Sequence, residues 1–246
     1  MSSTAARLAE RWNFHPELEI VGGYCSHVYA NEARVLKSPW QGEEQTSGYR
    51  AALALSGWWG PEVFESDEES GSLLMARVQP GTTLADSGVS EVEARRVCVN
   101  LIQSLSNRIE PGGFPTLRDY FSFNHPLLDQ LLESTGKTVF LHGDLHHFNI
   151  LWRESDHRWI PIDPKGIEGD LAYEPIAFLR NPRPLDHAVD ELEVLTRDRI
   201  AFFSSALDLD PWRIAAWGWI DCAESGEEGE GALKRAYERI LNNPKT

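Results

Sequence analysis

Residues 139–163 constrain this chain more than any other part of its sequence. An apolar run, Val-Phe-Leu, is followed by a polar loop that contains Asp144 and, five positions later, Asn149. A second apolar run, Trp-Ile-Pro-Ile, leads directly into Asp163. Short apolar runs bounded by polar residues are typical of buried strands. The sequence therefore predicts two strands that each deliver oxygen-bearing side chains to a loop.

An acid, an amide and a second acid in this order match the needs of phosphoryl transfer from ATP. One carboxylate must lie beside the acceptor hydroxyl, while an amide oxygen and another carboxylate hold magnesium on the phosphates. The spacing from Asp144 to Asn149 equals that of the kinase catalytic loop H-R-D-x-x-x-x-N, with Gly143 in place of the arginine. We therefore predict Asp144 as the catalytic base, and Asn149 and Asp163 as the Mg²⁺ ligands.

The same loop has two other interpretations. Imidazoles with a carboxylate suit zinc or iron, so a metal-dependent hydrolase centre is an alternative. Its ligands would be His142, Asp144, His146 and His147. The segment could also be an ordinary strand–loop–strand with polar loop residues. The kinase interpretation is favoured because a hydrolase loop would not require Asn149.

A nucleotide-binding lobe is predicted upstream. A strand at 18–21 runs into adjacent glycines, whose backbone N–H groups can approach a phosphate closely. A strand at 33–37 ends in Lys37, the expected position of a lysine that grips the α- and β-phosphates. A helix at 41–55 carries Glu44, with Glu43 close behind, either as the partner of Lys37 or as a first-turn acid favoured by the helix dipole.

The lobe is predicted to close with a strand at 71–78, followed by the breaker Gln-Pro-Gly at 79–81, where a hinge would fall. Adenine would then bond backbone groups between Ala76 and Val78. The complete set of predicted cofactor-binding residues is Gly22, Gly23, Ser26, Lys37, Glu44, Ala76 and Val78.

The chain resembles the aminoglycoside phosphotransferase superfamily, and within it the streptomycin 6-kinase and hydroxyurea phosphotransferase branch. The resemblance is carried by the motifs at 141–151, Ile-Asp-Pro-Lys-Gly at 162–166, Gly-Asp-Leu-Ala-Tyr-Glu at 169–174 and Phe-Leu-Arg-Asn-Pro at 178–182. It implies an α+β, bilobal protein-kinase-like fold, with a small antiparallel-sheet lobe and a mostly helical lobe.

The predicted lobe boundaries are 1–79 for nucleotide binding and 80–246 for catalysis and substrate binding. The resemblance also implies ATP and Mg²⁺ as cofactors and a small hydroxylated acceptor, such as streptomycin or hydroxyurea. Phosphorylation of that acceptor would confer antibiotic resistance. One departure is that the helix glutamate of the family usually sits a turn later, where this sequence has Gly48 and Tyr49. This departure keeps a nucleotide-binding pseudokinase, acting as an interaction module, among the alternatives.

Composition limits the partners. The net charge of −15 disfavours nucleic acid, because phosphate backbones require basic surfaces. No run approaches the roughly 20 apolar residues that a membrane span needs. The three cysteines are widely separated and form no disulfide framework, which suggests the reducing cytoplasm. We expect a cytoplasmic monomer or homodimer whose partner is a small-molecule acceptor.

The second lobe is predicted to be helical, with helices at 90–108, 127–132, 185–205, from 211 and at 232–241. Acidic residues cluster after the apolar part of the helix that begins at 211, as a solvated helix end or as a docking site for a guanidinium or amino sugar. The candidate substrate residues are His146, Asp221, Glu224 and Glu227. His146 and His147 are otherwise predicted to hold the loop, and Asp170, Glu174 and Arg180 to hold the segment after the metal site.

Overall fold

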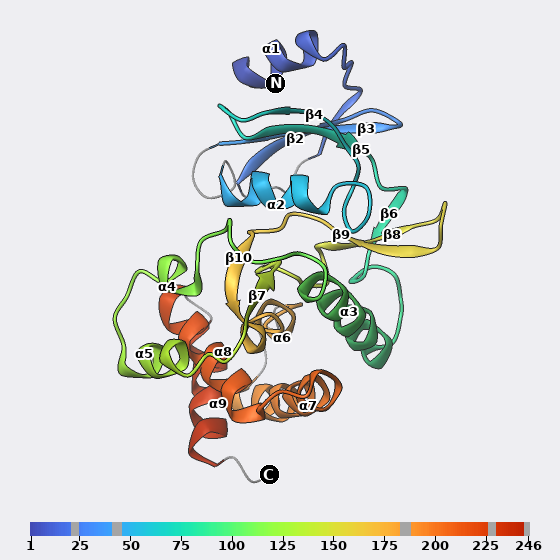
Figure 1. Ribbon diagram of the computed structural model, residues 1–246. Coiled ribbons are helices and arrows are strands. Elements are labelled where there is room, and N and C mark those ends of the chain that lie inside the picture. The colour runs from blue at the N-terminus through green and yellow to red at the C-terminus, as the bar shows by residue number, and fades with distance from the viewer. Residues whose placement is uncertain (21–24, 41–45, 183–187, 226–229, 244–246) are drawn as a thin grey trace. The chain divides into compact units, whose positions relative to one another are not determined.

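The structure is a computed structural model that describes residues 1–20, 25–40, 46–182, 188–225 and 230–243. Its internal contacts divide the chain into two compact units (Figure 1). Unit 1 comprises Met1–Ser87 and Asn149–Gly166, and unit 2 comprises Gly88–Phe148 and Ile167–Thr246. The predicted lobe boundary at 79/80 stays a prediction, and the segment Asn149–Gly166 groups with the N-terminal unit by its contacts.

Unit 1 is built on a five-stranded antiparallel sheet with the strand order β1-β2-β3-β5-β4. Its strands are β1 (Leu18–Ile20), β2 (Ser26–Ala30), β3 (Arg34–Pro39), β4 (Val63–Asp67) and β5 (Ser72–Ala76). Helices α1 (Ser3–Arg11) and α2 (Ser47–Leu55) lie on opposite faces of this sheet in Figure 1. The turn between β2 and β3 is closed by Asn31, whose side chain accepts hydrogen bonds from the N–H groups of Ala33 and Arg34.

The alternation of side chains along β3 and β5 decides which residues face each helix. Leu36 lies opposite Leu74, and both pack into an apolar cluster with Leu8 and other residues of α1. The next pair, Lys37 opposite Leu73, points to the other face, because successive side chains of a strand alternate. Each fully buried leucine of this kind contributes about 1.5–3 kcal/mol. Burial of the α1 face therefore fixes the register that presents Lys37 towards α2.

A second, three-stranded sheet in unit 1 brings two sequence-predicted residues together. It has the order β6-β8-β9, from β6 (Pro80–Thr83), β8 (Ile150–Arg153) and β9 (Arg158–Pro161). Ile150 lies opposite Pro161, and the N–H of Ile162 donates to the carbonyl of Asn149 over 2.9 Å. Asn149 and Asp163 therefore flank the same end of one hairpin. The predicted hinge at 79–81 is instead a cis Gln79–Pro80 peptide and the start of β6.

Unit 2 is mostly helical. Its elements are α3 (Glu91–Ser106), α4 (Leu117–Tyr120), α5 (Pro126–Glu133), β7 (Thr138–Leu141), β10 (Ile167–Asp170), a 3₁₀ helix at Leu171–Tyr173, α6 (Ile176–Leu179), α7 (Val189–Leu207), α8 (Pro211–Ser225) and α9 (Glu230–Asn242). Strands β7 and β10 pair in antiparallel register, with Leu141 opposite Ile167. This pairing places the start of the polar loop, just after Leu141, beside the segment that follows Gly166.

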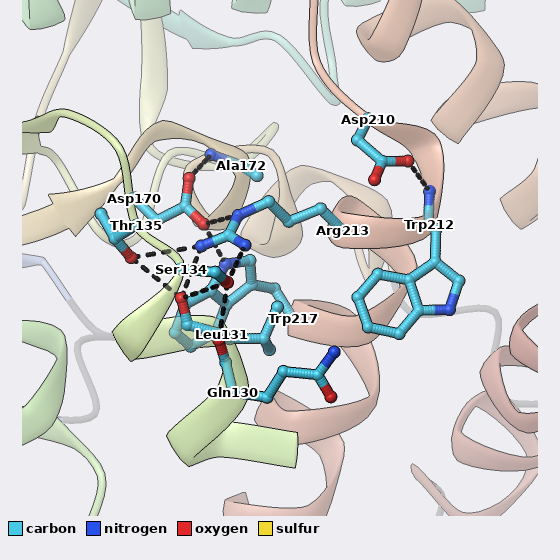
Figure 2. A network of polar contacts seen from close by, with 10 residues as sticks. All are labelled: Gln130, Leu131, Ser134, Thr135, Asp170, Ala172, Asp210, Trp212, Arg213 and Trp217. Carbon is cyan, nitrogen blue, oxygen red and sulfur yellow. Dashed lines mark hydrogen bonds and ion pairs between the residues drawn. The ribbon is translucent and has the colours of Figure 1, made fainter.

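Asp170 connects three elements of unit 2 (Figure 2). Its carboxylate accepts hydrogen bonds from the Ala172 N–H, from the Trp217 indole at 2.6 Å and from Arg213. Arg213 extends the network to α5 by donating to the Leu131 carbonyl and to the Ser134 hydroxyl. Because these groups come from β10, α5 and α8, the network joins segments that are distant in sequence. Asp170 thus joins β10 to α5 and α8 within unit 2, and its predicted role in holding the segment after the metal site stays a prediction.

The predicted α+β class is confirmed, with antiparallel sheet in unit 1 and mostly helices in unit 2. Helix α3 begins as predicted, because the Ser90 hydroxyl accepts a hydrogen bond from the N–H of Glu93. The predicted helix start at 185 falls outside the described residues, and α7 is described from Val189. Helix α1 has no counterpart among the predicted elements. Among the described residues, no helix is both long and apolar enough to cross a bilayer.

Candidate active site

The loop after β7 is held by Glu174. The N–H groups of His142 and Gly143 donate to the two oxygens of this carboxyl, over 3.0 and 3.2 Å. Gly143 has a φ of +79°, a backbone conformation that residues other than glycine rarely adopt. The sharp turn that leads into Asp144 therefore explains why a glycine stands where the kinase loop has an arginine.

Burial raises the pKa of Glu174 to about 8, although the two backbone N–H groups oppose this rise and the charge of Asp144 adds to it. Glu174 is only 3% exposed. A large part of Glu174 is thus neutral at pH 7, and the exposed negative charge of the loop is concentrated on Asp144. This arrangement suits a loop in which Asp144 acts on a substrate and Glu174 holds the backbone.

Asp144 lies between two nitrogen-bearing groups. His146 Nε2 is 3.6 Å from Asp144 Oδ2, and Arg180 Nη2 is 3.5 Å from Asp144 Oδ1. The Nδ1 atom of His146 accepts the N–H of Phe148, so the neutral imidazole carries its proton on Nε2, the nitrogen that faces Asp144. The Asp144 side chain is 22% exposed, which leaves the carboxylate accessible. His146 is therefore placed to orient Asp144 rather than to compete with it as a base.

His147 is a packing residue. Its ring stacks on Phe178 with a centroid distance of 3.9 Å, and neither ring nitrogen has a hydrogen-bond partner within the described chain. Burial, with a further contribution from the Arg199 charge, lowers the pKa of His147 to about 4. His147 is therefore neutral and buried, as expected for a residue that holds the loop.

A second group of candidate residues lies in unit 1. Asp163 has a φ of +58°, and its Oδ1 atom lies 3.1 Å from Lys37 Nζ. A left-handed backbone at a residue other than glycine is uncommon and is found at functional sites. A small cavity of about 40 Å³ lies beside this ion pair, lined by Tyr49, Leu73 and Met75 among others. Lys37, from the sheet, and Asp163, from the hairpin, are thus brought together by the fold.

The predicted partner of Lys37 is not among the described residues. Glu44 and Glu43 fall outside them, as do Gly22 and Gly23 of the predicted phosphate loop. Helix α2 begins at Ser47 and carries no acidic residue, and its Gly48 and Tyr49 line the cavity next to Lys37. Within the part of the chain that the structure describes, Lys37 forms an ion pair with Asp163.

Two other residues predicted to contact the nucleotide, Ser26 and Ala76, lie in strands of the five-stranded sheet. Ser26 begins β2, opposite Pro39, and is buried. The N–H of Ala76 donates to the Glu62 carbonyl over 2.8 Å. This bond uses the N–H of Ala76 but not its carbonyl, so the prediction that adenine bonds backbone groups between Ala76 and Val78 stays a prediction.

The predicted acidic docking cluster does not form a single exposed surface. Asp221 is 7% exposed, and its carboxylate accepts the Tyr173 hydroxyl at 2.9 Å and Arg180 Nη1 at 2.8 Å. Glu224, one turn further along α8, is partly exposed and accepts the N–H and hydroxyl of Ser122 through Oε1. Glu227 lies outside the described residues. Asp221 is therefore corrected from an exposed substrate ligand to a buried anchor of Arg180.

Arg180 is the residue whose place near Asp144 the sequence did not predict. It was expected only to hold the segment after the metal site, within the Phe-Leu-Arg-Asn-Pro motif. The contact with Asp144 spans 36 residues of chain, from 144 to 180, so no local spacing reveals it. The signal in the sequence was the presence of an arginine in an otherwise apolar segment, where a buried carboxylate partner is expected.

The geometry does not favour the hydrolase alternative. His142 Nδ1 accepts the N–H of Asp144, and His147 is stacked on Phe178. Among the described residues, no three or more His, Cys, Asp or Glu side chains are grouped so that they could hold a metal ion. The imidazoles of the loop therefore have other roles in this fold.

Comparisons with known proteins identify similar kinases. Residues 118–229 match the family described as aminoglycoside/hydroxyurea antibiotic resistance kinase. The streptomycin 3''-kinase of Klebsiella pneumoniae is 28% identical over 213 residues, which cover 76% of this chain and 77% of that protein. The streptomycin 6-kinase of Streptomyces griseus is 27% identical over 248 residues, which cover 88% and 79%.

The fold has solved counterparts. A crystal structure of a thermostable aminoglycoside phosphotransferase mutant, in complex with AMP-PNP and hygromycin B, matches with a TM-score of 0.65 at 13% identity, over the full length of both chains. At this identity the match concerns the fold alone, which is kinase-like. The family match over residues 118–229 and the two streptomycin kinases show that the chain is similar to small-molecule phosphotransferases, and they support the aminoglycoside/hydroxyurea antibiotic resistance kinase branch of the aminoglycoside phosphotransferase superfamily.

Proposed function

We propose that this protein transfers the γ-phosphoryl group of ATP to a hydroxyl of an aminoglycoside, with streptomycin as the first candidate acceptor, and thereby confers resistance. The observation that carries the proposal is the environment of Asp144. Its carboxylate is accessible, the two residues before it are held by Glu174 through their N–H groups, and it precedes Asn149 by five residues. Hydroxyurea is the other acceptor class, because the matching family includes kinases for it.

The proposed reaction forms one bond and breaks one. The acceptor oxygen bonds to the γ-phosphorus, the bond from that phosphorus to the β,γ-bridging oxygen breaks, and the bridging oxygen leaves with ADP. The acceptor proton passes to Asp144 and then to solvent. The transition state is loose, so catalysis consists mainly of positioning and charge stabilisation. Asp144 would orient the acceptor hydroxyl and receive its proton late.

The donor set at the hairpin end fits magnesium. Mg²⁺ prefers oxygen ligands, often one or two carboxylates with phosphate oxygens. Asn149 and Asp163 supply such oxygens from the same end of the hairpin, and the Asp163 side chain is 45% exposed. Bound there, the metal would neutralise phosphate charge. Lys37 would hold the phosphates from the adjacent sheet.

An acceptor with positive charge fits this chain better than a neutral one. The net charge is −15, which attracts cations to the surface. Glu224 is anchored through Oε1 and lies three residues from Asp221 on α8, so both face the same side of the helix. We assign Glu224, with His146 beside the base, to acceptor binding. A guanidinium or amino group of the sugar would dock on the Glu224 carboxylate.

An ATP-consumption screen across streptomycin, other aminoglycosides, hydroxyurea and neutral polyols tests the proposal. Two variants then separate the roles. Asp144→Asn should keep MgATP affinity while turnover falls by about 10²–10⁴, the typical contribution of a positioned general base. Asp163→Asn should lower MgATP affinity and turnover together. Equal loss of MgATP affinity in both variants would contradict the assigned roles, and turnover of polyols alone would exclude an aminoglycoside acceptor.

A second candidate is a nucleotide-binding pseudokinase. The observation that favours it is the Lys37–Asp163 ion pair, next to an α2 that carries no acidic residue. The same screen separates the two functions. Stabilisation by MgATP without turnover of any acceptor supports the pseudokinase, whereas turnover abolished by Asp144→Asn supports the kinase.

A further inference from the structure

The backbone around Arg180 is held by the buried side chain of Arg199. Arg199 is 3% exposed, and its Nη1 donates to the carbonyls of Phe178, Leu179 and Asn181, over 3.2, 2.9 and 2.9 Å. These carbonyls lie at and just beyond the C-terminal end of α6, where the donors of a continuing helix are missing; the Phe178 carbonyl also accepts the N–H of Asn181. The Arg199 side chain therefore binds carbonyls on both sides of Arg180 and fixes the position of the Arg180 backbone.

The Arg180 side chain is fixed by Asp221. Arg180 Nη1 donates to Asp221 Oδ2 over 2.8 Å, and the Tyr173 hydroxyl donates to Asp221 Oδ1 over 2.9 Å. Asp221 is buried, and burial together with the Asp221 charge raises the pKa of Tyr173, which keeps its hydroxyl a donor. A buried carboxylate with both oxygens engaged is a rigid partner. Asp221 and Tyr173 therefore hold the guanidinium in one place.

The other end of the same guanidinium faces the base. Arg180 Nη2 lies 3.5 Å from Asp144 Oδ1, a charge contact longer than an ordinary hydrogen bond. His146 faces the second oxygen, and Glu174 holds the loop backbone. Asp221 balances the Arg180 charge, so Asp144 is not fully neutralised. The Arg180 guanidinium thus orients the Asp144 carboxylate without forming a close hydrogen bond to it.

We propose that Arg180 is a positioning residue for the catalytic base, and that Asp221 and Tyr173 form the anchor that sets its reach to Asp144. This inference rests on the proposed kinase function and adds to it. The alternative is that Arg180 and Asp221 only stabilise unit 2, as Arg213 and Asp170 do. The Arg180–Asp221 pair joins α8 to the end of α6, and the Arg213–Asp170 pair joins α8 to the end of β10, so the second pair is a matched control.

The test compares neutralised pairs. In the double variant Arg180→Gln/Asp221→Asn, no buried charge is left alone, which avoids the large destabilisation that single removal of a buried partner causes. The control is Arg213→Gln/Asp170→Asn. Steady-state kcat and the KM values for ATP and acceptor are measured with streptomycin as acceptor, or as slow ATP hydrolysis if streptomycin is not phosphorylated. Thermal unfolding is recorded for every variant.

The expected result is a split between kcat and KM. The Arg180/Asp221 variant should lose about 10²-fold in kcat, the order expected for a misplaced catalytic group, with the ATP KM within about threefold of the parent. The Arg213/Asp170 variant should unfold at lower temperature and keep kcat while folded. Arg180→Lys should recover part of kcat, because it restores the charge but not the planar fork.

Three results would overturn the inference. They are a kcat within about twofold of the parent in the Arg180/Asp221 variant, an equal loss of kcat in the control pair, or a loss confined to the ATP KM. If the Arg180/Asp221 variant does not fold, Tyr173→Phe removes a single hydroxyl of the anchor. It should lower kcat several-fold, and an unchanged kcat would count against the anchor. Full activity of Asp144→Asn would instead reject the proposed function.

Discussion

Lys37 Nζ lies 3.1 Å from Asp163 Oδ1, so the predicted phosphate-binding lysine contacts the predicted metal-binding carboxylate. The Lys37 side chain is 15% exposed and that of Asp163 is 45% exposed. Both belong to unit 1, and α2 contributes no acid beside them. In this arrangement the Lys37 ammonium group balances the charge of the Asp163 carboxylate. Nucleotide binding is therefore expected to exchange the carboxylate for phosphate as the partner of Lys37.

Replacing Lys37 with Met should weaken the stabilisation of the protein by MgATP. A ligand at about 100 times its dissociation constant stabilises the folded state by roughly 2.7 kcal/mol. Removing the ammonium group should cancel most of this gain at the same nucleotide concentration. The measurement is thermal unfolding with and without MgATP. Lys137→Met, at an exposed lysine of unit 2, is the matched control and should keep the full shift. Equal shifts in both variants would remove Lys37 from the phosphate site.

Replacing Glu224 with Gln should raise the KM for a cationic acceptor and leave the ATP KM nearly unchanged. Glutamine can still accept the Ser122 hydroxyl, so the loop contact is kept while the charge is lost. Acceptor affinity of the parent protein should also fall with added salt, because exposed charges are screened over about 8–10 Å. Glu10→Gln, an exposed change of equal charge in unit 1, is the control. An unchanged acceptor KM would exclude Glu224 from acceptor binding.

The free energy of unfolding should decrease at acidic pH, because Glu168 becomes protonated there. Burial opposes its ionisation, but the N–H groups of Gly112, Gly113 and Phe114, at 2.6–2.7 Å, outweigh burial and place its pKa below the usual 4.5. A lowered pKa in the folded state means that the contribution is complete above about pH 4.5 and is lost as the pH falls through the folded value.

The corresponding measurement is the free energy of unfolding between pH 3 and pH 7 for the parent and for Glu168→Gln. The variant should be less stable at pH 7, because an amide cannot serve three donors as well as a carboxylate does. Its curve should also be flatter below about pH 4.5. Parallel curves for the two proteins would show that Glu168 does not titrate with folding.

Replacing Gly218 with Ala should destabilise unit 2, although alanine is the better helix former. A Cβ at Gly218 would lie 2.3 Å from Cζ of Tyr237, a fully buried ring on α9. Overpacking of this kind costs about 1–3 kcal/mol, more than the roughly 1 kcal/mol that alanine gains in a helix. For a chain of this size each kcal/mol lowers Tm by about 2–4 °C. Gly136→Ala, where a Cβ meets nothing within 4 Å, should leave Tm unchanged.

Local patterns were sufficient for the elements that carry their own signals. The two apolar runs around Asp144 and Asp163 became β7 and β9, because strand alternation and burial act over a few residues. The N-cap at Ser90 and the Pro at 211 likewise marked the starts of α3 and α8. The spacing from Asp144 to Asn149 was informative because the chemistry requires both groups on one short loop.

Only the tertiary structure decided the partners of these residues. Asp221 reads in sequence as part of an exposed acidic helix end, yet it is buried, because Tyr173 and Arg180 arrive from a segment more than 40 residues away. The pairing of Lys37 with Asp163 spans 126 residues. Ion pairs and buried hydrogen bonds depend on distance in space and on local desolvation, and neither is encoded in neighbouring residues. The sequence alone therefore determined which groups are candidates for the proposed chemistry, and the fold determined which residues hold those groups in place.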